Sequence, residues 1–133
     1  VPSGPGAGAE LDRAVVDRIP ALGVGIALDD FGRASSLAAL RVLPLAQVKI
    51  DAAFVHGVGR AGPDDAIVAS LAEMAHRLEL EVVAEGVESR RAWDAVADLG
   101  ADYAQGFYVQ APRPAHELTD WLERQWPAVA LAG

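Results

Sequence analysis

The sequence predicts an α/β domain built on a parallel sheet. Short apolar runs alternate along the chain with longer segments of helical periodicity, and each apolar run ends at a polar residue. The chain has 133 residues, of which 52% are hydrophobic, so it can bury one core but is short for two domains. Strands that alternate with helices in this way favour parallel pairing, with each helix crossing over a face of the sheet.

Each element has a local signal in the sequence. Strands are expected at short apolar runs bounded by glycine or polar residues. They cover residues 23–28, 47–50, 81–84 and 102–106. Helices are expected where apolar residues recur every three or four positions. They cover residues 10–19, 36–41, 64–78, 89–99 and 114–125.

The first predicted helix has a clear end, and the third has a clear apolar face. Pro20 ends the first, because proline cannot donate the next helical hydrogen bond. The third is the longest, and its apolar residues form one stripe, which predicts packing against the sheet. The stripe consists of Ile67, Leu71, Met74 and Leu78.

The last two helices carry capping signals. Ser89 is a suitable N-cap for the fourth helix, and Gly100 suits the left-handed residue that follows it. Pro114 suits the first turn of the final helix. In that helix Trp121 and Leu122 are expected to pack inward.

Charge and composition exclude several classes of protein. There are 11 basic and 19 acidic residues, a formal net charge of −8, which argues against binding nucleic acid or an anionic membrane. Without cysteine there is no disulfide, thiolate metal site or cysteine nucleophile, which suits the cytoplasm. No apolar run approaches the roughly 18 residues of a membrane span, so no membrane insertion is expected. Neither a dinucleotide-binding nor a P-loop glycine pattern follows a strand.

The ends of the chain and its histidines are given no functional role. Residues 1–9 are glycine, proline and alanine-rich, and we interpret them as a linker or an artificial remnant. Residues 127–133 form an uninformative tail. The three histidines are scattered and are expected to be surface or packing residues.

Polar residues stand at the carboxyl end of every predicted strand, the edge at which α/β proteins place their sites. They are Asp29 and Asp30, Lys49 and Asp51, Glu85, and Gln105. Lys49 is the only lysine in the chain. Taken singly, each residue could cap a turn or pair with a surface charge. Together, their carboxylates favour Mg²⁺, Mn²⁺ or Ca²⁺, and such ions would attract a phosphodiester to an acidic protein.

Four segments in order carry a family resemblance. They read LGVGIALDDFG, LPLAQVKIDAAFV, EVVAEGVES and GADYAQGFYVQAPRP. This set resembles the EAL domain family, bacterial phosphodiesterases that hydrolyse the second messenger cyclic di-GMP to linear pGpG. The resemblance covers residues 10–126, a partial EAL domain. It implies parallel (β/α) units that correspond to the carboxyl-terminal half of a TIM-like barrel.

The resemblance also implies roles for the residues at the strand ends. Asp29 and Asp30 match metal-binding aspartates, with Mg²⁺ or Mn²⁺ as the implied cofactor and Ca²⁺ as an inhibitor. Lys49 matches a lysine that steadies the catalytic water, and Glu85 a general base or water-orienting group. Gln105 matches a substrate-binding glutamine, and Glu88 matches a glutamate that stabilises the loop after the DDFG strand.

Several features depart from the family pattern. The chain contains no Glu-Ala-Leu tripeptide and no asparagine, so the family's asparagine metal ligand is absent from this sequence. The loop at residues 29–37, DDFGRASSL, is shorter than in the family. A half barrel would leave strand edges unpaired and one side of its apolar core exposed. We therefore expect that the chain alone lacks part of the active site and pairs with a second copy or with a complementary upstream half.

Other functions remain open from the sequence. The main alternative is a degenerate, non-catalytic module that binds cyclic di-GMP or a protein partner. A structural half barrel that only completes another chain is a further possibility, as is an unrelated metal-dependent barrel enzyme.

Overall fold

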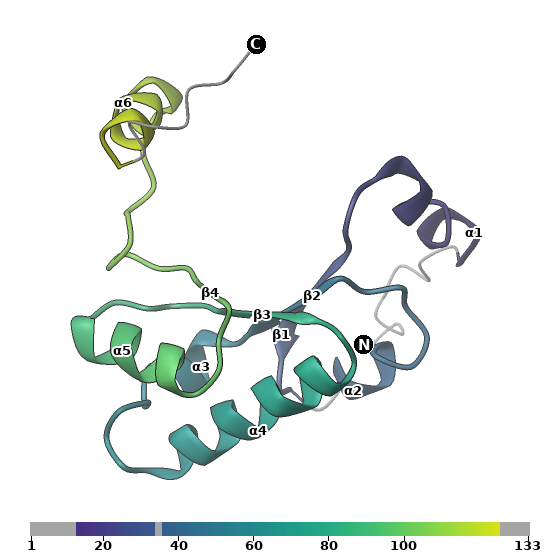
Figure 1. Cartoon of the computed structure of the whole chain (residues 1–133), viewed down its shortest axis with the longest axis horizontal. Helices are drawn as coiled ribbons and strands as arrows, with labels where there is room; N and C mark the ends of the chain where they lie inside the picture. Colours follow the sequence, from purple (N-terminus) through teal and green to yellow (C-terminus); the bar gives the residue numbers. More distant parts are fainter. Residues whose placement is uncertain (1–12, 34–35, 126–133) are drawn as a thin grey trace, which may run out of the picture.

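The computed structural model describes residues 13–33 and 36–125 and contains a four-stranded parallel sheet (Figure 1). Its strands are β1 (Ala27–Phe31), β2 (Gln47–Ile50), β3 (Glu81–Ala84) and β4 (Tyr103–Ala104), in the order β1-β2-β3-β4. Each strand thus lies beside the next in the chain, as in an arc of a barrel, whereas a doubly wound sheet reverses its order. The predicted α/β class with a parallel sheet is confirmed.

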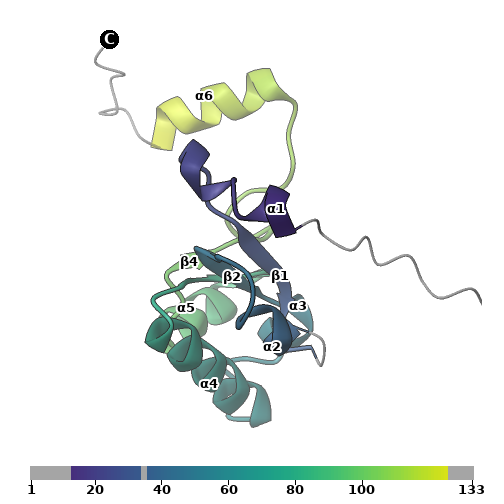
Figure 2. The same cartoon turned by 90° about the vertical axis from the view of Figure 1, so that its right-hand side faces the viewer.

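The helices are divided between the two sides of the sheet. They are α1 (Arg13–Val16), the 3₁₀ helix η1 (Pro20–Leu22), α2 (Ser36–Ala39), α3 (Ala52–Val55), α4 (Pro63–Arg77), α5 (Arg90–Asp98) and α6 (Ala115–Gln125). Helices α2 to α5 lie on one side, while α1 and α6 project on the other (Figures 1 and 2). We call the side that α2 to α5 cover the covered face of the sheet, and the opposite side its open face.

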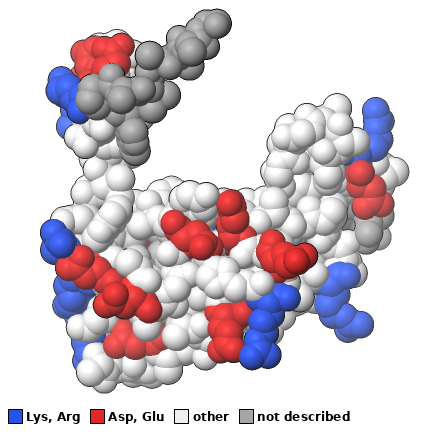
Figure 3. All heavy atoms as spheres, in the orientation of Figure 1, with Lys and Arg blue, Asp and Glu red and all other residues white. Residues whose placement is uncertain are grey.

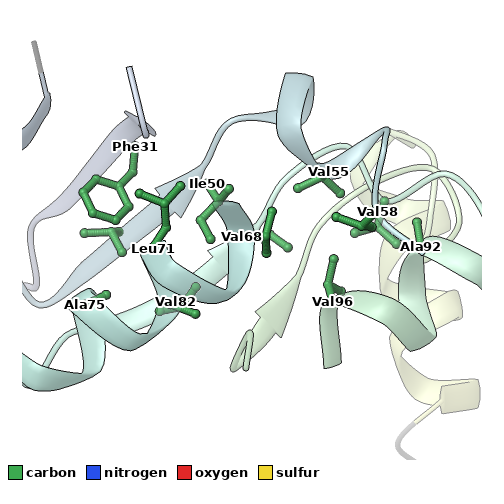
Figure 4. Packing of buried hydrophobic residues seen from close by; sticks show 14 of the residues in the cluster. Phe31, Ile50, Val55, Val58, Val68, Leu71, Ala75, Val82, Ala92 and Val96 are labelled. Atoms are coloured by element: carbon green, nitrogen blue, oxygen red, sulfur yellow. The ribbon is translucent and has the colours of Figure 1, made fainter. Parts of the chain in front are cut away.

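The covered face holds the hydrophobic core. Alternate residues of the strands point into it, and Val48, Ile50 and Val82 are completely buried. Figure 4 shows Leu71 of α4 beside Ile50, with the core continuing to Val96 of α5. Each large aliphatic side chain buried in this way contributes about 1.5–3 kcal/mol to folding.

The open face carries a polar row instead. Gln47, Glu81 and Tyr103 belong to its three adjacent strands β2, β3 and β4. Glu81 accepts hydrogen bonds from Gln47 Nε2 at 3.3 Å and from the Tyr103 hydroxyl at 3.1 Å. At these three positions the outward residues are polar, so this row does not form the exposed apolar side that the sequence predicts.

The outer edges of β1 and β4 have no further strand of the sheet beside them within residues 13–33 and 36–125. The expected unpaired strand edges are thus confirmed for the described chain. No helix among these residues is long and apolar enough to cross a bilayer. The predicted linker at 1–9 and tail at 127–133 lie outside the described residues.

The first strand lies further along the chain than predicted. The sequence predicts a strand over residues 23–28, but β1 begins at Ala27. Gly23 adopts a left-handed φ of +74° and ends η1, so the segment after it is not yet extended into the sheet. As a result, Asp29 and Asp30 lie inside β1 and not beyond its end.

The helices also differ from prediction at particular residues. Of the helix predicted over 10–19, the described part is helical only over Arg13–Val16. The short helix α3 was not predicted. In α4 the buried positions are Val68, Leu71, Ala72 and Ala75. Leu78, predicted in the buried stripe, is 48% exposed because α4 ends before it.

Helix α6 forms as predicted but does not pack inward as predicted. None of its residues is buried, and Leu122 is 43% exposed. Trp121 is half-buried. The reason is that α6 projects from the body of the protein on the open side, away from the core under α4 and α5 (Figure 1).

Candidate functional site

A β-bulge places two aspartates at the end of β1. Leu28 pairs with Val48 and Phe31 with Ile50, so three steps along β1 match two along β2. Asp30 adopts a φ of +53°, unusual for a residue other than glycine. The extra residue lets both Leu28 and Phe31 pack toward the core while Asp29 and Asp30 stay exposed.

The two aspartates are joined locally, since Asp29 Oδ1 accepts a hydrogen bond of 2.9 Å from the backbone N–H of Asp30. This bond fixes the Asp29 carboxylate beside the bulge. Bulges commonly redirect side chains next to active sites. Because of the bulge, the two aspartates that are adjacent in sequence both present their carboxylates on the surface at the end of β1.

Lys49 and Glu85 form an ion pair across the neighbouring strands. Lys49 Nζ donates a hydrogen bond to Glu85 Oε1, and about a fifth to a quarter of each side chain is exposed. This hydrogen bond raises the pKa of Lys49, burial opposes the rise, and the charges of Glu85 and Asp29 add to it. Lys49 is therefore cationic at neutral pH, with the carboxylate of Asp29 on one side and that of Glu85 on the other.

Asp51 has a structural task at the same edge. It is 5% exposed, and its Oδ1 accepts a hydrogen bond of 2.7 Å from Ala53 N–H, which caps α3. That bond holds the pKa of Asp51 below its ordinary value against the effect of burial, and the side chains of Arg33 and Asp30 lower it further. Its ion pair with Arg33 connects the segment after β1 to the start of α3.

Gln105 supports the loop that carries Glu85. Its backbone N–H donates to Ala84 at 2.9 Å, and its carbonyl accepts from Val87 N–H at 3.0 Å. Gly106 follows, and a Cβ there would lie 2.2 Å from the Val87 carbonyl oxygen, so only glycine fits this approach. The side chain of Gln105 is exposed.

Glu88 lies apart from this group. Its carboxylate is 59% exposed and lies 3.8 Å from the imidazole of His56, at the end of α3. Its role in holding the loop after β1 stays a prediction. His56 and His76 are both exposed, as predicted for the histidines, and His76 lies 2.9 Å from Asp102.

The chain offers part of a metal coordination set. Asp29 and Asp30 have the hard oxygen donors that Mg²⁺ and Mn²⁺ prefer. In the described part of the chain, however, no three carboxylate, imidazole or thiol groups are close enough together to hold an ion. Glu85 is already engaged by Lys49. Figure 3 shows several acidic side chains along the visible face of the sheet, as the net charge of −8 leads one to expect.

Sequence reasoning missed the bulge and the Arg33–Asp51 connection. The bulge had a signal: Leu28 and Phe31 are both apolar but three positions apart, which strict alternation along a strand forbids on one face. The Arg33–Asp51 ion pair had no sequence signal. Its partners are far apart in the chain, and no residue spacing specifies a charged pair across a sheet edge.

Comparisons with known proteins agree on one family. The EAL domain family matches residues 6–112. A bifunctional diguanylate cyclase and cyclic di-GMP phosphodiesterase, MucR of Pseudomonas aeruginosa, is 37% identical over 111 residues, covering 83% of this chain and 16% of MucR.

Solved structures give the same answer for the fold. The EAL domain of Mycobacterium smegmatis DcpA superposes with a TM-score of 0.79 at 35% identity, covering 84% of this chain and 51% of that one. A manganese and cyclic di-GMP complex of Klebsiella pneumoniae BlrP1 superposes with a TM-score of 0.65 at 35% identity, covering 71% and 24%. The chain thus spans about half of the DcpA domain and a smaller share of the longer relatives.

Proposed function

Because this chain belongs to the EAL domain family, we propose that it supplies the carboxyl-terminal half of a cyclic di-GMP phosphodiesterase site, which hydrolyses cyclic di-GMP to linear pGpG. The observation that supports this most is the Lys49–Glu85 ion pair beside Asp29 at the carboxyl edge of the sheet. An unrelated metal-dependent barrel enzyme would not share the family match.

Glu85 and Lys49 take the water-handling roles. Glu85 accepts a hydrogen bond from the attacking water and orients it, or accepts its proton as the oxygen approaches phosphorus. Lys49 holds the Glu85 carboxylate in place and offers its remaining N–H groups to the water or to a phosphate oxygen. Because the product pGpG carries a 5′-phosphate, the bond that breaks joins phosphorus to the 3′ oxygen, which leaves as a hydroxyl after gaining a proton.

Asp29 and Asp30 would hold Mg²⁺ or Mn²⁺ in this proposal. When bound, the ion supplies positive charge to the phosphodiester and lowers the pKa of the attacking water. The two carboxylates are exposed at the bulge, so an ion can reach them from solvent. Ca²⁺ is expected to allow nucleotide binding while hindering turnover. Gln105 directly follows β4, its side chain is exposed, and it is proposed to contact the nucleotide.

The rest of the site would come from a complementary half, either an upstream half of the same protein or a second copy of this chain. Three features support such a partner. They are the outer edges of β1 and β4, which no further strand of the described residues covers, the polar row on the open face between the projecting α1 and α6, and the half-length match to DcpA. The sequence contains no asparagine, so an asparagine ligand would have to come from an upstream half.

A second candidate is a non-catalytic module that binds cyclic di-GMP or a protein partner. It is favoured by the absence of a three-ligand group among residues 13–33 and 36–125. It is also favoured by the ion pair of Arg33 with Asp51, which ties down the segment after the bulge.

Calorimetric titration of cyclic di-GMP separates these candidates. One sample is the 133-residue chain, and the other joins residues 10–133 to the amino-terminal half of the MucR EAL domain; we call the latter the completed barrel. Each is titrated in Ca²⁺ and then assayed for pGpG in Mg²⁺ and Mn²⁺. The catalytic proposal predicts saturable binding and product from the completed barrel. Binding without product supports the module, and a folded completed barrel that does not bind cyclic di-GMP overturns the catalytic proposal and the nucleotide-binding form of the module.

A further inference from the structure

A pocket lies behind the loop that follows β3, between the end of α3 and the start of α5. Its volume is about 300 Å³. The residues that line it include His56, Arg60, Gly86, Glu88, Ser89 and Arg91. None of the residues to which the proposed chemistry is assigned, Asp29, Asp30, Lys49, Glu85 and Gln105, lines it.

The pocket concentrates positive charge in an acidic protein. Arg60 and Arg91 both line it, and Glu88 is the only carboxylate among the lining residues. The chain as a whole has a net charge of −8. A site with this balance of charge is suited to an anion, since the rest of the surface repels one.

The two pocket arginines differ from most other arginines in their partners. Arg77 pairs with Glu73 and Arg90 with Asp94 on the helix surfaces. Over the described ranges, neither Arg60 nor Arg91 forms a hydrogen bond or an ion pair through its side chain. Their guanidinium groups are therefore available to a ligand.

The neighbouring polar groups leave room for an anion. Asp65, near the Arg60 segment, is turned to the backbone, where it accepts a hydrogen bond of 2.7 Å from Gly59 N–H. Ser89 Oγ accepts from Ala92 N–H at 3.1 Å, while the N–H groups of Arg90 and Arg91 have no acceptor within the helix. The start of α5 thus adds backbone donors to the arginines.

We propose that this pocket binds a phosphate group, either as free inorganic phosphate or as the phosphate of a nucleotide monoester. Two arginine side chains that line one cavity offer planar sets of N–H donors, which match the oxygens of a tetrahedral phosphate better than they match a halide. The volume accommodates the group with its remaining water. This inference goes beyond the proposed function and does not depend on it.

The pocket shares a loop with the proposed catalytic edge. Gly86 lines the pocket and directly follows Glu85. Gly86 has a φ of +70°, and a Cβ there would lie 2.6 Å from the Cβ of Ala52, so this loop is pressed onto α3. A phosphate in the pocket therefore contacts the segment that holds Glu85, and we expect it to restrain that segment.

Nuclear magnetic resonance of the 133-residue chain tests the site directly. Inorganic phosphate is titrated while the backbone amides of Gly86, Arg90 and Arg91 are followed, against sodium chloride at equal ionic strength. We expect saturable shifts with phosphate that chloride does not reproduce. Arg60→Gln and Arg91→Gln should each weaken the affinity about tenfold, the loss of one charge-assisted hydrogen bond. Arg41→Gln, an exposed arginine outside the pocket, is the matched control and should bind normally.

A second arm identifies the source of the phosphate. Guanosine 5′-monophosphate that binds more tightly than phosphate indicates a nucleotide, and equal affinities indicate the free ion. Shifts that fail to saturate, that chloride reproduces, or that persist unchanged in both arginine variants overturn the proposal. Because the probe is a phosphate and the readout is not hydrolysis, this outcome leaves the proposed phosphodiesterase function untouched.

Discussion

The covered and open faces of the sheet use the same strands for opposite purposes. In β2, Val48 and Ile50 are fully buried on the covered face, whereas Gln47 and Lys49 alternate with them on the open face and carry polar groups. The covered face gains its stability from helices within this chain. The open face gains little from the described residues and holds the groups of the proposed site.

This difference indicates how half of a barrel can keep an ordered core. The hydrophobic cluster under α4 and α5 is complete without residues from the open side (Figure 4). On the open face, the side chains of Gln47 and Tyr103 both donate hydrogen bonds to Glu81 within this chain. Stability and proposed function are therefore separable by mutation, residue by residue along one strand.

The largest effect on stability is expected on the covered face. Ile50→Ala removes a completely buried side chain from the core and should lower the free energy of unfolding by about 2–5 kcal/mol. Urea unfolding followed by circular dichroism measures the loss. Gln47→Ala, on the other face of the same strand, is the matched control and should change stability far less. Equal losses for the two variants would break the distinction between the faces.

A smaller effect is expected for Asp51, the buried carboxylate at the border between the faces. Asp51→Ala removes the cap of α3 and should cost about 0.5–2 kcal/mol at neutral pH. Its pKa is lowered in the folded protein, so the ionised group stabilises the fold above its ordinary pKa of 3.8. This contribution is lost as the pH falls through the lower, folded-state pKa.

The same variant gives a pH test. Unfolding of wild type and Asp51→Ala is compared at pH 7 and then at successively lower pH. The difference between them should shrink in acid, since both then lack a carboxylate at position 51. A difference that stays constant with pH would show that the ionised cap and its pair with Arg33 contribute nothing to stability.

The smallest effect is expected on the open face. Tyr103→Phe removes the hydroxyl that donates to Glu81, the same bond that raises the pKa of Tyr103. Both side chains are exposed, so the isolated chain should unfold at an unchanged urea concentration. In the completed barrel this row becomes interior, and the same substitution should then be destabilising. A clear loss in the isolated chain would mean that its open face is already covered.

Much of the fold could be predicted because its signals are local. The apolar runs of β2 and β3, the cap at Ser89 and the periodicity of α4 each depend on a few adjacent residues. The predicted start of β1 was wrong because a glycine-rich apolar segment matches the sequence pattern of a strand even where it does not pair with a neighbouring strand. The direction of α6 was wrong because amphipathicity predicts an apolar face but not which part of a protein covers it.

The sequence is enough to propose members of the candidate site, but it does not predict the geometry that joins them. Asp29, Asp30, Lys49, Glu85 and Gln105 were identified from their places after strands and from the family resemblance. Their contacts depend on register and on the bulge at Asp30, which no pair of neighbouring residues determines. The pocket with Arg60 and Arg91 had no sequence signal, because its parts come from the segment between α3 and α4, the loop between β3 and α5, and the start of α5.

Hydrolysis of cyclic di-GMP by the completed barrel tests the central claim, that the carboxyl edge of the open face is half of a phosphodiesterase site. With Mg²⁺ or Mn²⁺, wild type should release pGpG, and Lys49→Ala should lower kcat by about 10²–10³-fold, as for loss of one transition-state donor. Arg41→Ala, the exposed-cation control, should retain full activity. Full activity in a folded Lys49→Ala variant, or no product from a folded wild-type barrel, would contradict the account.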